Sequence, residues 1–190
     1  MIENEVGRHK ALIVEDDLVI AEQVIEMLDA LGHECHHTET LVGAAALLAL
    51  HDFCYVLLDL QIKAKDRSIP TTVAGQTCLT ETRAKNPGRK PGIEDHHYLQ
   101  ILIMSAHAKD HASVVWALTH RADDFILKPF SDNDPKAEVK IRHALHRSGR
   151  GSHNDCAEMT RRAKGVQVAM PAAPVQQPVV HGVAVPAPQP

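Results

Sequence analysis

Short apolar runs alternate with segments of helical periodicity along the first 148 residues. Apolar runs bounded by polar residues are typical of strands buried in a parallel sheet. We predict strands over five segments: 10–15, 33–38, 54–58, 99–104 and 124–127. We predict helices over 18–31, 40–50, 75–85, 108–120 and from Pro135 onward. This alternation predicts a doubly wound α/β fold, in which helices cover both faces of a five-stranded parallel sheet.

The predicted helices carry boundary signals and inner faces. Gly32 is a stop signal for the first helix, and Thr38 or Thr40 caps the second. Asp134 is the expected N-cap of the last helix, with Pro135 at its first position. The expected inner faces are three apolar sets: Leu18, Ala21, Val24, Ile25, Leu28 and Leu31; Val114, Ala117 and Leu118; Ala137, Ile141, Ala144 and Leu145.

The composition changes near residue 148. The last 20 residues hold 6 of the 11 prolines and no Asp, Glu, Lys or Arg. Such a segment cannot offset its chain entropy by burying apolar surface. We therefore expect one domain over 8–148 and a disordered, Pro-rich tail over 149–190, which leaves no room for a winged helix or a catalytic domain.

Charge and cysteine usage narrow the function classes. Lys and Arg number 20 against 24 Asp and Glu, and the net charge of −4 argues against direct binding to DNA or to an anionic membrane. The longest apolar stretch, near 43–50, is far shorter than the roughly 20 residues that span a bilayer. The four cysteines form no CxxC pair, and the N-terminus resembles no secretory signal. We expect a cytoplasmic protein with reduced thiols.

Polar side chains follow the predicted strands at the points where the strands end. Glu15 and Asp16 close the first strand, Asp59 the third, Ser105 the fourth and Lys128 the fifth. Ligand sites of parallel sheets lie outside the carboxyl ends of the strands. Clustered carboxylates repel one another, and a hard cation such as Mg²⁺ relieves that repulsion. A Mg²⁺ ion, a nucleophilic carboxylate at Asp59 and a lysine together indicate phosphoryl transfer.

Four segments at these strand ends resemble the receiver domain of bacterial two-component response regulators. They are ALIVEDD (11–17), LLDL (57–60), IMSA (103–106) and ADDFILKPF (122–130). The resemblance covers roughly residues 8–147 and implies a flavodoxin-like fold of the receiver type. Each segment is common by itself, and their occurrence in this order at successive strand ends gives the resemblance its specificity.

The resemblance implies a role for each acidic residue. Asp59 matches the phosphoacceptor, which takes a phosphoryl group from a phosphohistidine on a sensor kinase or a histidine phosphotransferase. Asp16 matches a direct Mg²⁺ ligand, and Glu15 matches the acid that acts through water. The backbone carbonyl of Gln61 would be a further metal ligand.

The resemblance also implies a switch and an output face. Ser105 matches the hydroxyl that binds the phosphoryl oxygen, and Phe125 matches the aromatic whose rotamer follows it. Lys128 matches the lysine of the family pattern, and the bond from Lys128 to Pro129 would be cis. Residues 108–147 would contact a downstream protein, and phosphorylation would promote a dimer.

The sequence departs from the family pattern beside the site. Lys63 and Arg67 stand where Pro and Gly are common, and Gly75 is the expected equivalent of that glycine. The loop over 60–74 is therefore longer by about eight residues, and a second long loop follows over 86–98. Arg121 replaces a glycine before the Ala-Asp pair. These departures leave partner selection open.

Two other functions compete with the phosphoacceptor. An aspartyl-phosphate hydrolase usually has a second Asp two residues after its nucleophile, and this chain has Gln61 there. The second alternative is a receiver-like scaffold that never carries phosphate. Such a scaffold would not need the polar residues at the strand ends, and their retention in this chain argues against it.

Overall fold

A computed structural model of the chain describes residues 8–88, 98–105, 111–128 and 135–147. Strands and helices alternate throughout these segments, and the strands are β1 (Lys10–Val14), β2 (Glu34–Thr38), β3 (Tyr55–Asp59), β4 (Gln100–Ser105) and β5 (Asp124–Leu127). The helices are α1 (Leu18–Ala30), α2 (Leu41–Leu50), α3 (Thr72–Lys85), α4 (His111–Thr119) and α5 (Pro135–Arg147). The expected tail over 149–190 lies outside the described residues, as do 89–97 of the second long loop, Pro129 and Asp134.

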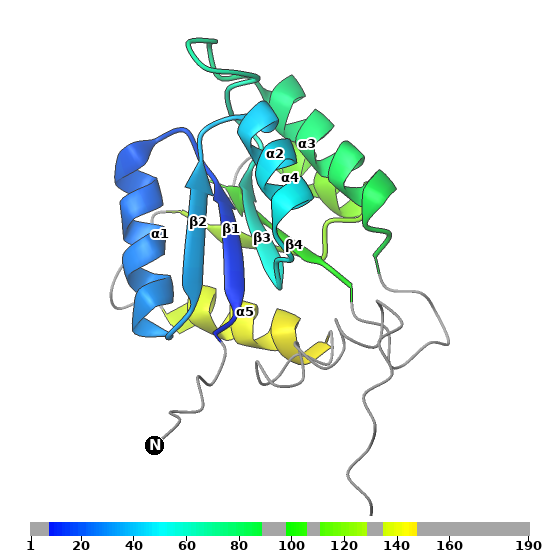
Figure 1. The fold of residues 1–190 in the computed structure, drawn as a ribbon. Helices are drawn as coiled ribbons and strands as arrows, with labels where there is room; N and C mark the ends of the chain where they lie inside the picture. The colour runs from blue at the N-terminus through cyan, green and yellow to red at the C-terminus, as the bar shows by residue number, and fades with distance from the viewer. Residues whose placement is uncertain (1–7, 89–97, 106–110, 129–134, 148–190) are drawn as a thin grey trace, which may run out of the picture.

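The strands form one parallel sheet in the order β2-β1-β3-β4-β5. Helices α1 and α5 cover one face of the sheet, and α2, α3 and α4 cover the other (Figure 1). The predicted doubly wound fold is confirmed. In this topology the chain reverses direction next to β1, so a switch point lies between β1 and β3 at their carboxyl ends.

The sheet separates two apolar cores because successive side chains of a strand point to opposite faces. In β1, Ala11 and Ile13 pack with α1 and α5, whereas Leu12 and Val14 pack with α2, α3 and α4. All four are fully buried. The interior positions of β1, β3 and β4 are therefore apolar on both faces, and their polar residues lie at the strand ends.

Most helix signals in the sequence are confirmed by the caps. Thr40, not Thr38, is the N-cap of α2 and accepts a hydrogen bond of 2.9 Å from the Gly43 N–H. Gly32 follows α1 at a positive φ of 76°, where glycine is favoured. The inner face of α5 is confirmed, since Ala137, Ile141, Ala144 and Leu145 are buried.

Three details of the helices differ from the sequence prediction. Helix α3 begins at Thr72 rather than Gly75, because the Thr71 side chain caps it by accepting a hydrogen bond from the Ala74 N–H. Leu118 does not join the inner face of α4 and is 41% exposed, since only Ala117 of that set is fully buried. Leu18 is likewise 55% exposed at the first turn of α1.

Gly75 fits the close approach of α3 to the segment after β3. A Cβ atom at this position would lie 2.1 Å from the carbonyl oxygen of Leu60. Only glycine allows the two backbones to approach this closely. None of the helices in the described segments is both long and apolar enough to cross a bilayer.

Candidate functional site

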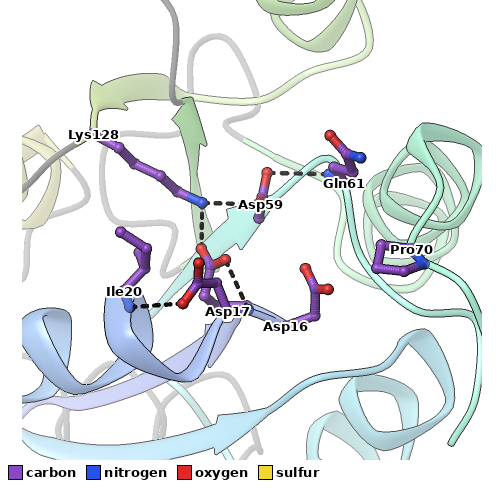
Figure 2. A pocket seen from close by; sticks show the side chains of 8 residues that line it. Asp16, Asp17, Ile20, Asp59, Gln61, Pro70 and Lys128 are labelled. Atoms are coloured by element: carbon purple, nitrogen blue, oxygen red, sulfur yellow. Dashed lines mark hydrogen bonds and ion pairs between the residues drawn. The ribbon is translucent and has the colours of Figure 1, made fainter. Parts of the chain in front are cut away.

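Three carboxylates meet at the carboxyl edge of the sheet. Glu15 and Asp16 follow β1, and Asp59 is the last residue of the neighbouring strand β3. One carboxylate oxygen from each residue lies within 4.8 Å of the other two, a spacing at which the three can hold one metal ion. The predicted convergence of these acids is confirmed (Figure 2).

Lys128 supplies a cation to this group from the end of β5. Its Nζ lies 2.5 Å from Oε2 of Glu15 and 2.8 Å from Oδ2 of Asp59. The Lys128 side chain is only 7% exposed and the Glu15 side chain 1%. The backbone N–H of Lys128 also donates a 2.7 Å hydrogen bond to the Ser105 carbonyl, which fixes the end of β5 against β4.

Three carboxylates lie near the single ammonium of Lys128, and the pKa values of Glu15 and Asp16 are raised. Burial, and then the neighbouring Asp59 charge, raises the pKa of Glu15 to about 7 although Lys128 opposes the shift. Burial and Asp59 also raise the pKa of Asp16. Burial lowers the pKa of Lys128, but the nearby Asp59 and Glu15 outweigh burial and raise it. The site therefore carries excess negative charge that a bound cation would relieve.

Asp17 has a structural role and does not join the carboxylate group. Its Oδ1 accepts a 2.9 Å hydrogen bond from the Val19 N–H, as the N-cap of α1. A capped helix start directs the side chain toward its own helix. The Asp17 N–H donates to Glu15 Oε1 at 3.3 Å, which orients the buried carboxylate.

The carboxylates open into a pocket of about 450 Å³. Its walls come from the ends of β1, β3 and β5, from α1 and from the loop before α3: Glu15, Asp16, Asp17, Ile20, Asp59, Gln61, Pro70 and Lys128. Gln61 donates its backbone N–H to Asp59 Oδ1 at 3.1 Å, which holds one oxygen of this carboxylate. The pocket is large enough for a phosphoryl group together with water.

Ser105 and Phe125 lie on the strands next to the site. Ser105 ends β4, one residue beyond the Met104 that pairs with Asp59 across the sheet. Phe125 pairs with Ile103 on the other side of β4. The Phe125 ring is half-buried, and Nζ of Lys140 lies 3.8 Å from the ring centroid.

Two contacts to the site have no signal in the sequence. His37, on the edge strand β2, lies with its Nε2 2.8 Å from the backbone carbonyl of Glu15. A carbonyl can only accept, so this ring nitrogen carries the hydrogen. Pro70 forms a pocket wall although it is eleven residues from Asp59. Both contacts join segments that only folding brings together.

Comparison with known proteins decides the family. The sequence profile of the response regulator receiver domain matches residues 11–140. The chain belongs to this family. The chain is 32% identical over 145 residues to the transcriptional regulatory protein PmrA of Pectobacterium parmentieri, and this match covers 76% of the chain. The chain spans about half (55%) of the length of that relative.

Solved receiver structures share the fold of this domain. The receiver domain of NtrX from Brucella abortus is 24% identical with a TM-score of 0.57, and the match covers 72% of this chain and 98% of that one. A two-component response regulator from Clostridium difficile is 17% identical with a TM-score of 0.58, covering 74% and 98% of the two chains. At such identities the likeness concerns the fold alone.

Proposed function

We propose that this receiver domain is a phosphoacceptor switch of a two-component phosphorelay, in which Asp59 takes the phosphoryl group from a phosphohistidine. The observation that carries the proposal is the meeting of Glu15, Asp16 and Asp59 with the ammonium of Lys128 in one pocket. This is the arrangement of charges that phosphoryl transfer to a carboxylate needs. Family membership supports it.

The donor set fits Mg²⁺. Three carboxylates with one cation leave unbalanced negative charge, and burial together with the neighbouring Asp59 raises the pKa of Glu15. Asp16, Asp59 and the backbone carbonyl of Gln61 would hold the ion, and Glu15 would act through a bound water. When bound, Mg²⁺ neutralises charge on the phosphoryl oxygens and orients them for in-line transfer.

Asp59 is the nucleophile. Lys128 and the Gln61 N–H each bind one of its oxygens. The attacking oxygen forms a bond to phosphorus as the bond from phosphorus to the donor imidazole nitrogen breaks, and that nitrogen leaves with its electron pair. The Lys128 ammonium then compensates the charge of the new phosphoryl group.

Ser105 and Phe125 would transmit the change to the surface. Ser105 ends the strand beside β3, one residue beyond the partner of Asp59, and its hydroxyl would bind a phosphoryl oxygen on Asp59. The rotamer of Phe125 would follow the position of the Ser105 hydroxyl. Phosphorylation would thereby shift the equilibrium between two conformations of the domain. Output would then leave through protein contacts of residues 108–147, with dimerisation as one result.

Incubation with acetyl phosphate and Mg²⁺ tests the proposal. The wild-type protein should gain the mass of one phosphoryl group as an acid-stable, base-labile adduct, and EDTA should prevent it. Asp59→Asn should gain none, while Asp52→Asn, exposed at the other end of the sheet, is the matched control. Equal labelling of wild type and Asp59→Asn would refute the assignment and favour the phosphate-independent scaffold.

Control of transcription is a second candidate for the output, because the PmrA relative is a transcriptional regulator. Phosphorylated and unphosphorylated full-length chain can be compared for binding to promoter DNA in a mobility-shift assay. Binding that depends on Asp59 would favour this output over one limited to protein contacts.

A further inference from the structure

The segment between β3 and α3, residues 60–71, is a folded loop with a fixed base. Ile62 is fully buried, and its carbonyl accepts a 2.8 Å hydrogen bond from the Thr71 N–H. The carbonyls of Lys63 and Ala64 accept hydrogen bonds of 2.9 and 3.2 Å from the first two N–H groups of α2. The loop therefore caps a neighbouring helix, and its base is held from both sides.

The tip of this loop projects beyond the carboxyl edge of the sheet (Figure 1). Lys65 and Ser68 close a turn, in which the Ser68 hydroxyl donates a 2.7 Å hydrogen bond to the Lys65 carbonyl. Arg67 has a φ of +64°, in the left-handed region, where a residue with a Cβ atom is destabilised by about 1 kcal/mol. Ile69 is 81% exposed, the largest exposed fraction among the large apolar side chains of the described residues.

The tip stands at the mouth of the Asp59 pocket. Gln61 and Pro70, at the two ends of the loop, line one wall of the pocket, and Ile69 directly precedes Pro70. The opposite wall comes from Asp17 and Ile20 at the start of α1 (Figure 2), and Val19 beside them in the sequence is 64% exposed. Each of these two walls is therefore adjacent in the sequence to an exposed apolar residue. A small phosphodonor would enter without covering these apolar residues, whereas a protein donor would have to pass over them.

We propose that the loop tip, residues 65–69, is a docking arm for the protein that delivers the phosphoryl group, with Ile69 as its apolar anchor. This inference rests on the proposed function of Asp59. The tip carries Lys65 and Arg67 against a single acid, Asp66. The donor surface that it fits has an apolar patch beside the phosphohistidine and a carboxylate that faces Arg67.

Phosphotransfer from two kinds of donor tests the docking arm. Purified sensor histidine kinases, autophosphorylated with labelled ATP, are assayed with the wild-type chain, and the fastest donor is used for the variants. Ile69→Ser is compared with Leu50→Ser, which removes a similarly exposed side chain (76%) at the far end of α2. Acetyl phosphate serves as the donor that needs no docking.

We expect Ile69→Ser to lower kcat/KM with the kinase at least about fivefold, the loss typical of an interface anchor. Leu50→Ser should leave it unchanged, and both variants should match wild type with acetyl phosphate, since neither residue lines the pocket. Equal kinase transfer to Ile69→Ser and wild type would overturn the docking arm while leaving Asp59 as phosphoacceptor. Transfer from acetyl phosphate alone, with no kinase active on wild type, would also count against it. Failure of acetyl phosphate to label wild type would instead refute the proposed function.

Discussion

Two buried ion-pair groups lie at opposite edges of the sheet, and they differ in their charge balance. At the carboxyl edge, Lys128 faces two carboxylates, with Asp16 close by. At the amino edge, Arg83 has Asp123 as its single carboxylate partner among the described residues. A cluster with surplus charge costs stability that a ligand can restore, whereas a balanced pair needs nothing further.

The amino-edge group is complete in its hydrogen bonds. Arg83 donates to the carbonyls of Arg121 and Leu99, each at 2.7 Å, and Asp123 accepts from the Ile101 N–H at 2.7 Å. These bonds join the end of α3 to the beginning of β4 and to the turn before β5. Arg121 itself has a φ of +74°, in the left-handed region usual for glycine, and its carbonyl is held by Arg83. We interpret this group as structural.

Removal of one partner from the balanced pair should have the largest effect. Arg83→Met leaves Asp123 charged and buried, and we expect a loss of about 4 kcal/mol in the free energy of unfolding, measured with urea. Arg142→Met, which breaks an exposed pair with Glu138, is the control and should change little. A loss below about 1 kcal/mol for Arg83→Met would show that the pair is not the structural anchor described here.

The amino edge should also lose stability in acid. Burial, and then His9, lowers the pKa of His33 to about 4 from its ordinary 6.5, and the neutral ring is hydrogen-bonded to the Tyr55 hydroxyl at 2.7 Å. The unfolded state then binds more protons between about pH 6.5 and 4, so stability is complete above 6.5 and falls with decreasing pH. The loss should reach about 3 kcal/mol.

Urea titrations from pH 7.5 to 4 check this. His33→Gln should remove the fall in stability toward low pH, and His146→Gln, exposed on α5, should not. The raised pKa of Glu15 adds a slope of the opposite sign, which both variants retain. An unchanged slope in His33→Gln would assign the acid sensitivity to another group.

The carboxyl edge should respond in chemistry more than in stability. Lys128→Met removes the only cation that contacts Asp59 in the described residues, and we expect loading by acetyl phosphate to fall at least about 100-fold. Lys140→Met, over the Phe125 ring, changes a cation outside the pocket and should retain loading. Rates are measured by intact-protein mass spectrometry.

The smallest effect concerns the surplus charge itself. Without metal at pH 8, Glu15→Gln removes one of the repelling carboxylates, so the protein should gain about 1 kcal/mol in stability and bind Mg²⁺ more weakly. Wild type should gain more from added Mg²⁺ than the variant. If Glu15→Gln is less stable than wild type without metal, Lys128 stabilises Glu15 more than the carboxylates destabilise it.

Local sequence pattern predicts much of this domain. The continuous apolar segments of β1, β3 and β4 are typical of strands at the centre of a parallel sheet, where both faces are buried. Parallel strands have their carboxyl ends on the same edge of the sheet. The meeting of Asp16, Asp59 and Lys128 follows from those two facts. The residue roles assigned by resemblance to Glu15, Gln61, Ser105 and Phe125 stay predictions until phosphorylation is measured.

Other features depended on how distant segments pack. Asp17 directly follows Glu15 and Asp16 in the sequence, but in the structure it caps α1, whereas Glu15 lies buried beside Lys128. The pairing of Arg83 with Asp123 spans 40 residues and has no local signal.

The sequence by itself determined the order of strands and helices and the edge at which the chemistry lies, because hydrophobic periodicity is a local property. Tertiary structure alone decided that Glu15 and Asp59 both contact Lys128. It also decided that His37 binds the Glu15 carbonyl and that the loop before α3 forms a pocket wall. Those outcomes depend on distances between segments that are far apart in the chain, and the distances are set only when both apolar cores are packed.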